Sequence, residues 1–148
     1  MHIKIREPQT AIDYMFLRNI RIQVFVIEQQ IPWLWEFDEF DEFDTSAIHL
    51  IVENNQQIIG TGRFYPSNDD SIYKLGRMAV LKNFRGLGIG TKILNKFEDI
   101  AKSKNISEIY LEAQSDKLSF YLKQNYVPKG DKYIMDGIYH NLMSKTIL

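Results

Sequence analysis

Hydrophobic side chains along the first part of the chain follow a strand spacing and then a helix spacing. Residues 2–6 alternate between apolar and charged side chains, which predicts a strand that ends before Pro8. After Thr10, a residue suited to cap a helix, apolar side chains recur every three or four positions. They are Ile12, Phe16, Ile20, Val24 and Ile27. This spacing predicts a long helix with these side chains on its buried face.

The rest of the chain alternates between strand and helix patterns. It predicts helices at 88–104 and 115–124 and strands at 48–53, 57–65, 72–81, 107–114, 127–135 and 138–146. Asp136-Gly137 between the last two strands is a strong signal for a two-residue hairpin. The helix at 88–104 lies between two strands, so those strands form a parallel pair with a right-handed crossover. We therefore expect an α/β (α+β) fold with a mixed, mostly antiparallel sheet of about seven strands, flanked by helices on both faces.

Composition narrows the classes of function. The 148 residues fit one domain, 1–148, and the formal net charge of −1 offers no field that would recruit nucleic acid or an anionic membrane. The chain has no cysteine, which excludes a disulfide framework, a thiolate metal site and a cysteine nucleophile. The first residues do not resemble a signal peptide, and no apolar stretch approaches the ~20 residues that span a bilayer. We expect a cytoplasmic protein without a bound metal.

A glycine-rich stretch lies between the strand at 72–81 and the following helix. It reads Arg85-Gly86-Leu87-Gly88-Ile89-Gly90-Thr91. Glycine lets the backbone approach a ligand closely, and the first N–H groups of a helix together with its dipole attract anions. The spacing fits neither a Walker loop nor the dinucleotide fingerprint. It fits Arg/Gln-x-x-Gly-x-Gly/Ala, although a turn that serves packing alone stays open.

That loop, preceded by residues 75–81, resembles the central motif of the GNAT superfamily of N-acetyltransferases. Ala113, Gln114, Phe120, Tyr121 and Tyr126 are similar to the next motif of that superfamily. Residues 21–29 and 136–143 are similar to its small-molecule branch, the glyphosate N-acetyltransferase and ElaA-like group. One departure is Asn125-Tyr126 where the family has Gly-Phe; Asn also tolerates the left-handed conformation, so we expect the helix cap to persist.

The resemblance implies a splayed parallel pair of strands that binds acetyl-CoA as co-substrate. The pantetheine arm would lie in the gap, held by backbone groups of Met78, Ala79 and Val80, and the N–H groups of residues 86–91 would hold the pyrophosphate. The backbone N–H of Met78 would stabilise the oxyanion of a tetrahedral intermediate. The acetyl group would pass directly to a primary amine of a small molecule, or less readily to a peptide amine. A non-catalytic acyl-CoA-binding module is the alternative.

Two residues are candidates for proton transfer. Tyr121 matches the tyrosine that acts as acid in the family, and the alternative is a core aromatic. His140 matches a histidine that acts as base in relatives such as the glyphosate N-acetyltransferases, and a neutral imidazole can accept the proton of the amine. The alternative for His140 is a side chain that only fills a strand face.

An acidic, aromatic segment at residues 33–44 is the candidate acceptor wall. It contains Trp33, Trp35 and the triplet Glu-Phe-Asp three times in succession, at 36–44. Its carboxylates would attract a cationic amine if they faced a cleft. Alternatively, the phenylalanines share one buried face and the acids lie in water. Glu36 and Asp38 are therefore candidate acceptor contacts. Arg21 and Arg77 are candidates by family resemblance.

The apolar last strand suggests a possible homodimer.

Overall fold

The computed structural model of the chain describes residues 1–42 and 45–148. The described residues group into two compact units. Unit 1 contains Met1–Tyr65 and Arg77–Phe97, and unit 2 contains Pro66–Gly76 and Glu98–Leu148. The strand β4 (Ile72–Val80) and the helix α3 (Ile89–Ser103) each begin in one unit and end in the other.

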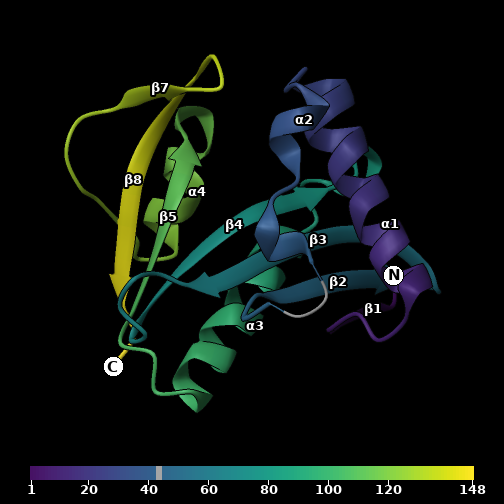
Figure 1. The fold of residues 1–148 in the computed structure, drawn as a ribbon, viewed down its shortest axis with the longest axis horizontal. Coiled ribbons are helices and arrows are strands. Elements are labelled where there is room, and N and C mark those ends of the chain that lie inside the picture. The colour runs from purple at the N-terminus through teal and green to yellow at the C-terminus, as the bar shows by residue number, and fades with distance from the viewer. Residues whose placement is uncertain (43–44) are drawn as a thin grey trace. The chain divides into compact units, whose positions relative to one another are not determined.

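Unit 1 has antiparallel strands with a helix on each face (Figure 1). Besides parts of β4 and α3, its elements are β1 (Ile3–Arg6), α1 (Ala11–Arg21), η1 (Ile22–Glu28), α2 (Trp33–Glu36), η2 (Glu39–Asp41), β2 (Ile48–Asn54), β3 (Gln57–Pro66) and η3 (Lys82–Phe84). On one face, Leu17 and Ile20 of α1 pack with Ile51 of β2. On the other face, the Phe97 ring of α3 lies 5.1 Å from that of Phe64 in β3. The expected helices on both faces are present in this unit.

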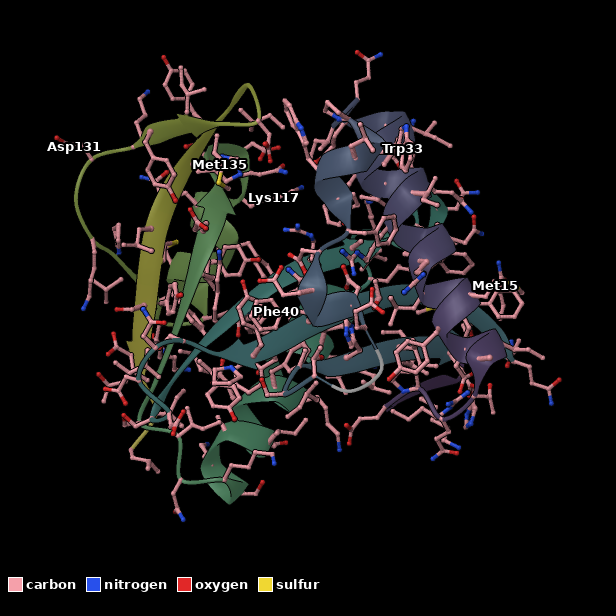
Figure 2. All side chains as sticks on the ribbon, viewed as in Figure 1. Met15, Trp33, Phe40, Lys117, Asp131 and Met135 are labelled. Carbon is pink, nitrogen blue, oxygen red and sulfur yellow. The ribbon has the colours of Figure 1, made fainter. Side chains whose placement is uncertain are left out.

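The buried stripe of α1 differs from the one that the sequence predicts. Thr10 caps the helix as expected, because its hydroxyl accepts the N–H of Asp13 at 3.1 Å. However, Ile12, Phe16 and Ile27 are 61%, 45% and 66% exposed, and Figure 2 shows Met15 projecting outward from α1. The side chains that turn inward include Asp13, Leu17, Ile20, Arg21, Val24 and Phe25. After Arg21 the chain continues as the wider π-helix η1, so a constant helical spacing does not hold along the whole segment.

Unit 2 consists mainly of strands. Its elements are β5 (Glu108–Gln114), η4 (Ser115–Lys117), α4 (Leu118–Lys123), β6 (Val127–Pro128), β7 (Tyr133–Met135) and β8 (Ile138–Thr146). The strand expected at 127–135 is interrupted, because Pro128 cannot donate to a ladder and Gly130 turns the chain with φ +78°. The hairpin at Asp136-Gly137 is confirmed, with φ of 55° and 75° and Met135 paired to Ile138.

Among the described residues, hydrogen-bonded strands follow the order β1-β2-β3-β4-β5-β8-β6, with β7 also beside β8. β4 and β5 are parallel, from Ile72 opposite Glu108 to Leu75 opposite Leu111. The expected mixed, mostly antiparallel sheet is confirmed, with eight strands instead of about seven. No helix in this described part of the chain is both long and apolar enough to cross a membrane.

Candidate active site

The predicted phosphate loop in unit 1 has the backbone that its glycines require. Gly86 and Gly88 take φ of +76° and +81°, the left-handed region that glycine enters without steric cost. A Cβ on either residue would meet no atom within 4 Å, so conformation and not packing requires glycine there. α3 begins directly afterwards at Ile89, and the first N–H groups of a helix have no partner within the helix itself. The loop therefore has the geometry of an anion site.

Arg85 opens this loop and is already paired with a carboxylate. Its Nη1 and Nη2 atoms donate to the two carboxylate oxygens of Glu28 at 3.0 and 2.9 Å. Its Nε donates to the carbonyl of Val80 at 2.8 Å. The guanidinium thus connects the last residue of β4 to the end of η1. Its charge is compensated by Glu28 in this structure.

The end of β4 carries the residues predicted to hold the pantetheine arm. Arg77 has φ of 50°, which breaks the extended conformation of the strand immediately before Met78. Ala79 is buried in the same hydrophobic core as Leu17 and Ile20 of α1. Met78 and Val80, its neighbours on the strand, are only partly buried. A left-handed residue within a strand acts as an irregularity that redirects the following residues. The break falls where the family's cofactor-binding segment would begin.

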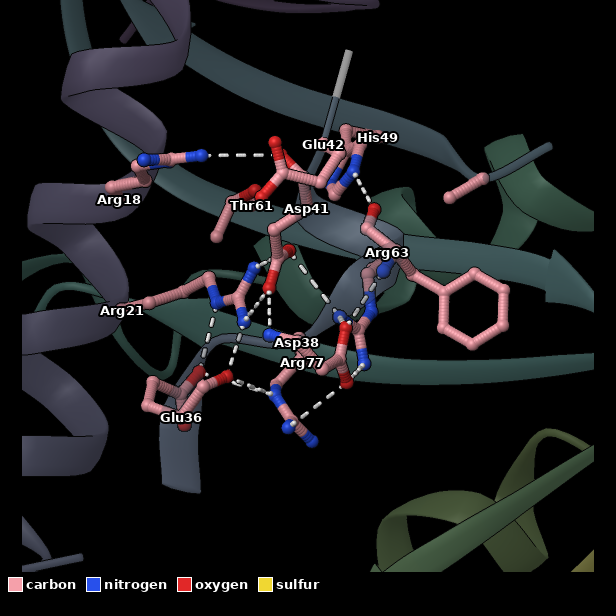
Figure 3. A network of polar contacts seen from close by, with 12 residues as sticks. Arg18, Arg21, Glu36, Asp38, Asp41, Glu42, His49, Thr61, Arg63 and Arg77 are labelled. Atoms are coloured by element: carbon pink, nitrogen blue, oxygen red, sulfur yellow. Dashed lines mark hydrogen bonds and ion pairs between the residues drawn. The ribbon is translucent and has the colours of Figure 1, made fainter. Parts of the chain in front are cut away.

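Within unit 1, three arginines hold the acidic segment against α1, β3 and β4 (Figure 3). Arg21 of α1 donates through Nε to Glu36 at 2.8 Å and through Nη2 to Asp41 at 3.2 Å. Arg63 of β3 donates to both carboxylate oxygens of Asp38, at 2.6 and 3.0 Å. Arg77 of β4 lies 3.1 Å from Glu36. We call these six residues, three arginines and three acidic side chains, the arginine network.

The arginine network determines how the acidic side chains of residues 33–42 are buried. Arg21, Glu36 and Asp41 are buried, so these two acids lie neither in water nor on an open cleft wall. The members that reach solvent are Asp38 and Arg77, with side chains 31% and 29% exposed. Figure 2 labels Phe40, whose ring stacks on Tyr65 at 3.9 Å. The last two residues of the third triplet, 43 and 44, lie outside the described residues.

Burial and ion pairing act in opposite directions on the carboxyl groups of this network. For Glu36, burial raises the pKa by more than Arg77 and Arg21 lower it. For Asp41, burial also favours the neutral form, but the hydrogen bond and charge of Arg21 prevail and lower the pKa to about 2. Asp41 is therefore ionised at neutral pH, and it had no place among the residues predicted for the site. Arg21 stood between the apolar positions of the predicted buried stripe, so the sequence pattern gave no signal that this arginine is buried and needs a carboxylate partner.

Tyr121 lies on α4 in unit 2 and is partly buried. Burial raises the pKa of its phenol to about 12, so the hydroxyl keeps its proton at neutral pH. Its ring meets that of Tyr126 edge to face, with centroids 6.0 Å apart. Asn125 ends the helix with φ of 69°, and the N–H of Tyr126 donates to the carbonyl of Tyr121 at 3.1 Å. The expected left-handed cap at Asn125 is confirmed.

His140 lies on β8 in unit 2, opposite Gln114 of β5. Its Nδ1 is 2.8 Å from the carbonyl of Ile138, and because a carbonyl only accepts, Nδ1 carries the proton and Nε2 the lone pair. Nε2 has no hydrogen-bond partner within residues 1–42 and 45–148. In this part of the chain, the buried side-chain nitrogen and oxygen atoms without a hydrogen-bond partner are Nδ1 of His49 and Nε of Arg63, so Nε2 of His140 is not one of them. His140 as a whole is 5% exposed, and Nε2 is the ring nitrogen left to accept a proton.

Comparison with known proteins places the chain and its fold in one family. The sequence profile of the Acetyltransferase (GNAT) family matches residues 14–126. The chain is 34% identical to the uncharacterized protein YyaT of Bacillus subtilis (strain 168), over 98% of this chain and 97% of YyaT. It is also 34% identical to the uncharacterized N-acetyltransferase YjcF of the same organism, over 85% and 87% of the two chains. The crystal structure of Escherichia coli ElaA matches the fold with a TM-score of 0.85 at 23% identity, covering 97% and 98%.

The chain therefore belongs to the Acetyltransferase (GNAT) family. It is an acetyl-CoA-dependent acetyltransferase, with acetyl-CoA or CoA as its co-substrate.

Proposed function

We propose that this protein transfers the acetyl group of acetyl-CoA directly to a primary amine of a small molecule, with a peptide amine as the less favoured acceptor. The observation that carries the proposal is the left-handed pair Gly86 and Gly88 at the start of α3, in a chain of the GNAT family. The loop offers amide donors to an anion, and membership of the GNAT family indicates that the anion is the pyrophosphate of acetyl-CoA. An anion that carries two phosphates and a pantetheine arm fits both.

The cofactor would be bound by backbone groups of unit 1. The N–H groups of residues 86–91 would donate to the pyrophosphate, helped by the dipole of α3. Backbone groups of Met78, Ala79 and Val80 would hydrogen-bond the pantetheine arm as a neighbouring strand would. The side chains of Arg85 and Thr91 would add charge and a hydroxyl donor, and Arg85 would have to share its guanidinium with Glu28 or leave it.

The chemistry requires a neutral amine, a stabilised oxyanion and a protonated leaving group. An amine of pKa ~10.4 is mostly protonated at pH 7, which adds about 4–5 kcal/mol to the barrier. His140 would take that proton through Nε2, directly or through one water. The nitrogen then bonds to the acetyl carbon, and the N–H of Met78 would donate to the oxyanion. Collapse of the intermediate breaks the carbon–sulfur bond and releases the CoA thiolate, while the nitrogen loses its second proton to water and becomes the amide.

Tyr121 would assist that last step as a hydrogen-bond donor. A phenol with a pKa of about 12 holds its proton more tightly than a thiol does, whose pKa is ~8.5. Complete transfer to the thiolate is therefore uphill by about 5 kcal/mol if no other group helps. A hydrogen bond to the sulfur in the transition state stabilises the developing charge without that cost. This is the role that the protonated phenol fits best.

The acceptor contacts remain predictions for Arg21, Arg77, Glu36 and Asp38. Two of them, Asp38 and Arg77, reach solvent, while Arg21 and Glu36 are buried behind them. Because each arginine of the network already has an acidic partner, none is left free for an acidic acceptor. The proposal therefore favours amines that carry no phosphate or carboxylate group next to the reactive nitrogen.

The test is release of free thiol from acetyl-CoA in the presence of a panel of amines. The panel contains a polyamine, an aminosugar, an amino acid and a peptide with a free N-terminus. Tyr121→Phe and His140→Gln are expected to lower kcat by about 10²-fold or more, whereas Tyr139→Phe, an exposed control on β8, leaves it unchanged. Binding of acetyl-CoA without thiol release from any amine would contradict the proposal and favour a non-catalytic acyl-CoA-binding module.

A further inference from the structure

One face of the sheet in unit 2 brings four polar side chains from four strands together. Lys74 of β4 pairs with Tyr110 of β5, and Glu112 lies two residues further along β5 on the same face. His140 of β8 pairs with Gln114 on one side and with Tyr133 of β7 on the other. Lys74, Glu112, Tyr133 and His140 therefore share this face.

Glu112 is held at both of its carboxylate oxygens. Nζ of Lys74 donates to Oε1 at 2.6 Å, and the phenol of Tyr133 donates to Oε2 at 2.5 Å. Burial alone would raise the pKa of Glu112, but these two donors lower it, so the carboxylate is ionised and acts as an acceptor. A short hydrogen bond to an ionised acceptor is of the strong kind. The oxygen of Tyr133 is thereby fixed to β5.

The ring of Tyr133 in turn lies nearly parallel to the ring of His140 and offset from it. The two rings are stacked, with centroids 6.1 Å apart and planes 24° from parallel. The imidazole is thus held on its face by Tyr133 and at its Nδ1 edge by the carbonyl of Ile138. β7 is only three residues long and follows a stretch that contains the left-handed turn at Gly130. The anchor on Glu112 supplies a constraint that so short a strand lacks.

We propose that Glu112 and Tyr133 are positioning residues for His140. Glu112, held by Lys74, fixes the Tyr133 phenol, and the Tyr133 ring keeps the imidazole in the orientation that leaves Nε2 to accept a proton. This inference rests on the proposed role of His140 as base. Neither positioning residue exchanges a proton with the acceptor. A base displaced by about 1 Å can lose a large factor in rate, so loosening this support lowers kcat.

A double-mutant cycle measures whether the two residues act as one unit. Tyr133→Phe and Glu112→Ala are each expected to lower kcat about tenfold, with the KM for acetyl-CoA unchanged within about twofold. The kcat of the double variant is expected to be no lower than that of the slower single variant, because both changes remove the same hydrogen bond. Glu112→Gln keeps an oxygen acceptor for the phenol and stays within about twofold of the wild type. Losses that multiply to about a hundredfold in the double variant would overturn the inference.

Two matched controls separate positioning from general damage. Glu108→Ala removes a carboxylate from the same strand, where it pairs with Lys129 at 3.5 Å, and Tyr139→Phe removes a phenol from β8. Both are expected to retain wild-type kcat. If Glu108→Ala lowers kcat as much as Glu112→Ala does, loss of charge on β5 and not positioning explains the effect.

The imidazole can also be observed without any turnover. The chain has three histidines, so the ring signals of His140 are assigned by their loss in His140→Gln. Long-range proton–nitrogen spectra at a pH where the ring is neutral should show the Nδ1–H form in the wild type and a mixture of forms in Tyr133→Leu and Glu112→Ala. Unchanged spectra in both variants would overturn the positioning role. If the wild type releases no thiol, the proposed function fails, and these spectra still decide the inference.

Discussion

Both carboxylate oxygens of Glu28 accept hydrogen bonds from the guanidinium of Arg85, at 3.0 and 2.9 Å. Glu28 ends η1 and Arg85 begins the phosphate loop, so an acidic side chain lies next to the proposed anion site. The pair is partly exposed, and such pairs contribute about 1 kcal/mol or less to stability. Its larger effect is on the electrostatic potential of the loop.

Glu28→Gln is expected to tighten the binding of CoA about two- to fivefold at low ionic strength. The substitution removes a negative charge that repels the pyrophosphate and releases Arg85 to contact it. Calorimetric titrations in ~0.05 M and ~0.5 M salt check this, because the gain should fade as salt screens the interaction. Glu39→Gln, an exposed carboxylate of the acidic segment, is the control. Weaker binding by Glu28→Gln would instead show that the ion pair holds the loop in its binding conformation.

Gly88→Ala should weaken CoA binding about tenfold or more. A non-glycine residue at φ +81° costs about 1 kcal/mol, and the backbone relaxes away from the conformation that aims its amides at the phosphates. Gly130→Ala is the matched control, since Gly130 has φ +78° and equal space for a Cβ but lies outside the loop. Thermal melting should place both variants at similar stability. Equal CoA affinity of the two would contradict the assignment of the loop.

Gly62→Ala is expected to lower the free energy of unfolding by about 1–3 kcal/mol. Its Cβ would lie 2.7 Å from Cε2 of Phe97 and 3.1 Å from Cγ2 of Ile93, both on α3. Denaturant unfolding measures the loss, with Gly76→Ala, whose Cβ would meet nothing within 4 Å, as the control. Adding Phe97→Leu to Gly62→Ala should recover part of the lost stability. An unchanged free energy of unfolding in Gly62→Ala would mean that α3 packs less closely on β3 than these distances indicate.

Asp41→Asn should lower the free energy of unfolding at pH 7 by about 3–5 kcal/mol, because it leaves the buried guanidinium of Arg21 with one carboxylate fewer. The pKa of Asp41 is about 2 in the folded chain, below the usual ~3.9. Its contribution is therefore fully present above about pH 4 and disappears as the pH falls toward 2. Unfolding curves of wild type and variant should converge on acidification. A difference that persists unchanged at pH 2.5 would contradict the ion-pair origin.

Local features of this chain could be predicted from sequence because their causes are local. The cap at Thr10, the left-handed Asn125 and the Asp136-Gly137 hairpin each depend on the conformational preferences of one or two residues. The parallel pair of β4 and β5 follows from the helix between them. The buried face of α1 and η1 could not be predicted correctly. η1 changes the helical spacing after Arg21, and Arg21 itself turns inward to polar partners from a distant segment.

The roles of the candidate site residues stay predictions. The glycine loop, Tyr121 and His140 stand at positions that a family motif marks. Arg21, Arg77, Glu36 and Asp38 were marked as acceptor contacts. Their pairing in the arginine network was not, since it joins α1, β3 and β4 to the acidic segment through long-range contacts. The support of His140 by Tyr133 likewise depends on the register of β7 with β8, which an interrupted strand did not reveal.

Calorimetric titration of the purified protein with acetyl-CoA tests the central claim most directly. The account predicts binding with a 1:1 stoichiometry that Gly88→Ala weakens and Gly130→Ala does not. It also predicts that adding a reactive amine from the panel converts the bound acetyl-CoA to free CoA. No heat of binding with either acetyl-CoA or CoA, under conditions where the protein is folded, would contradict it.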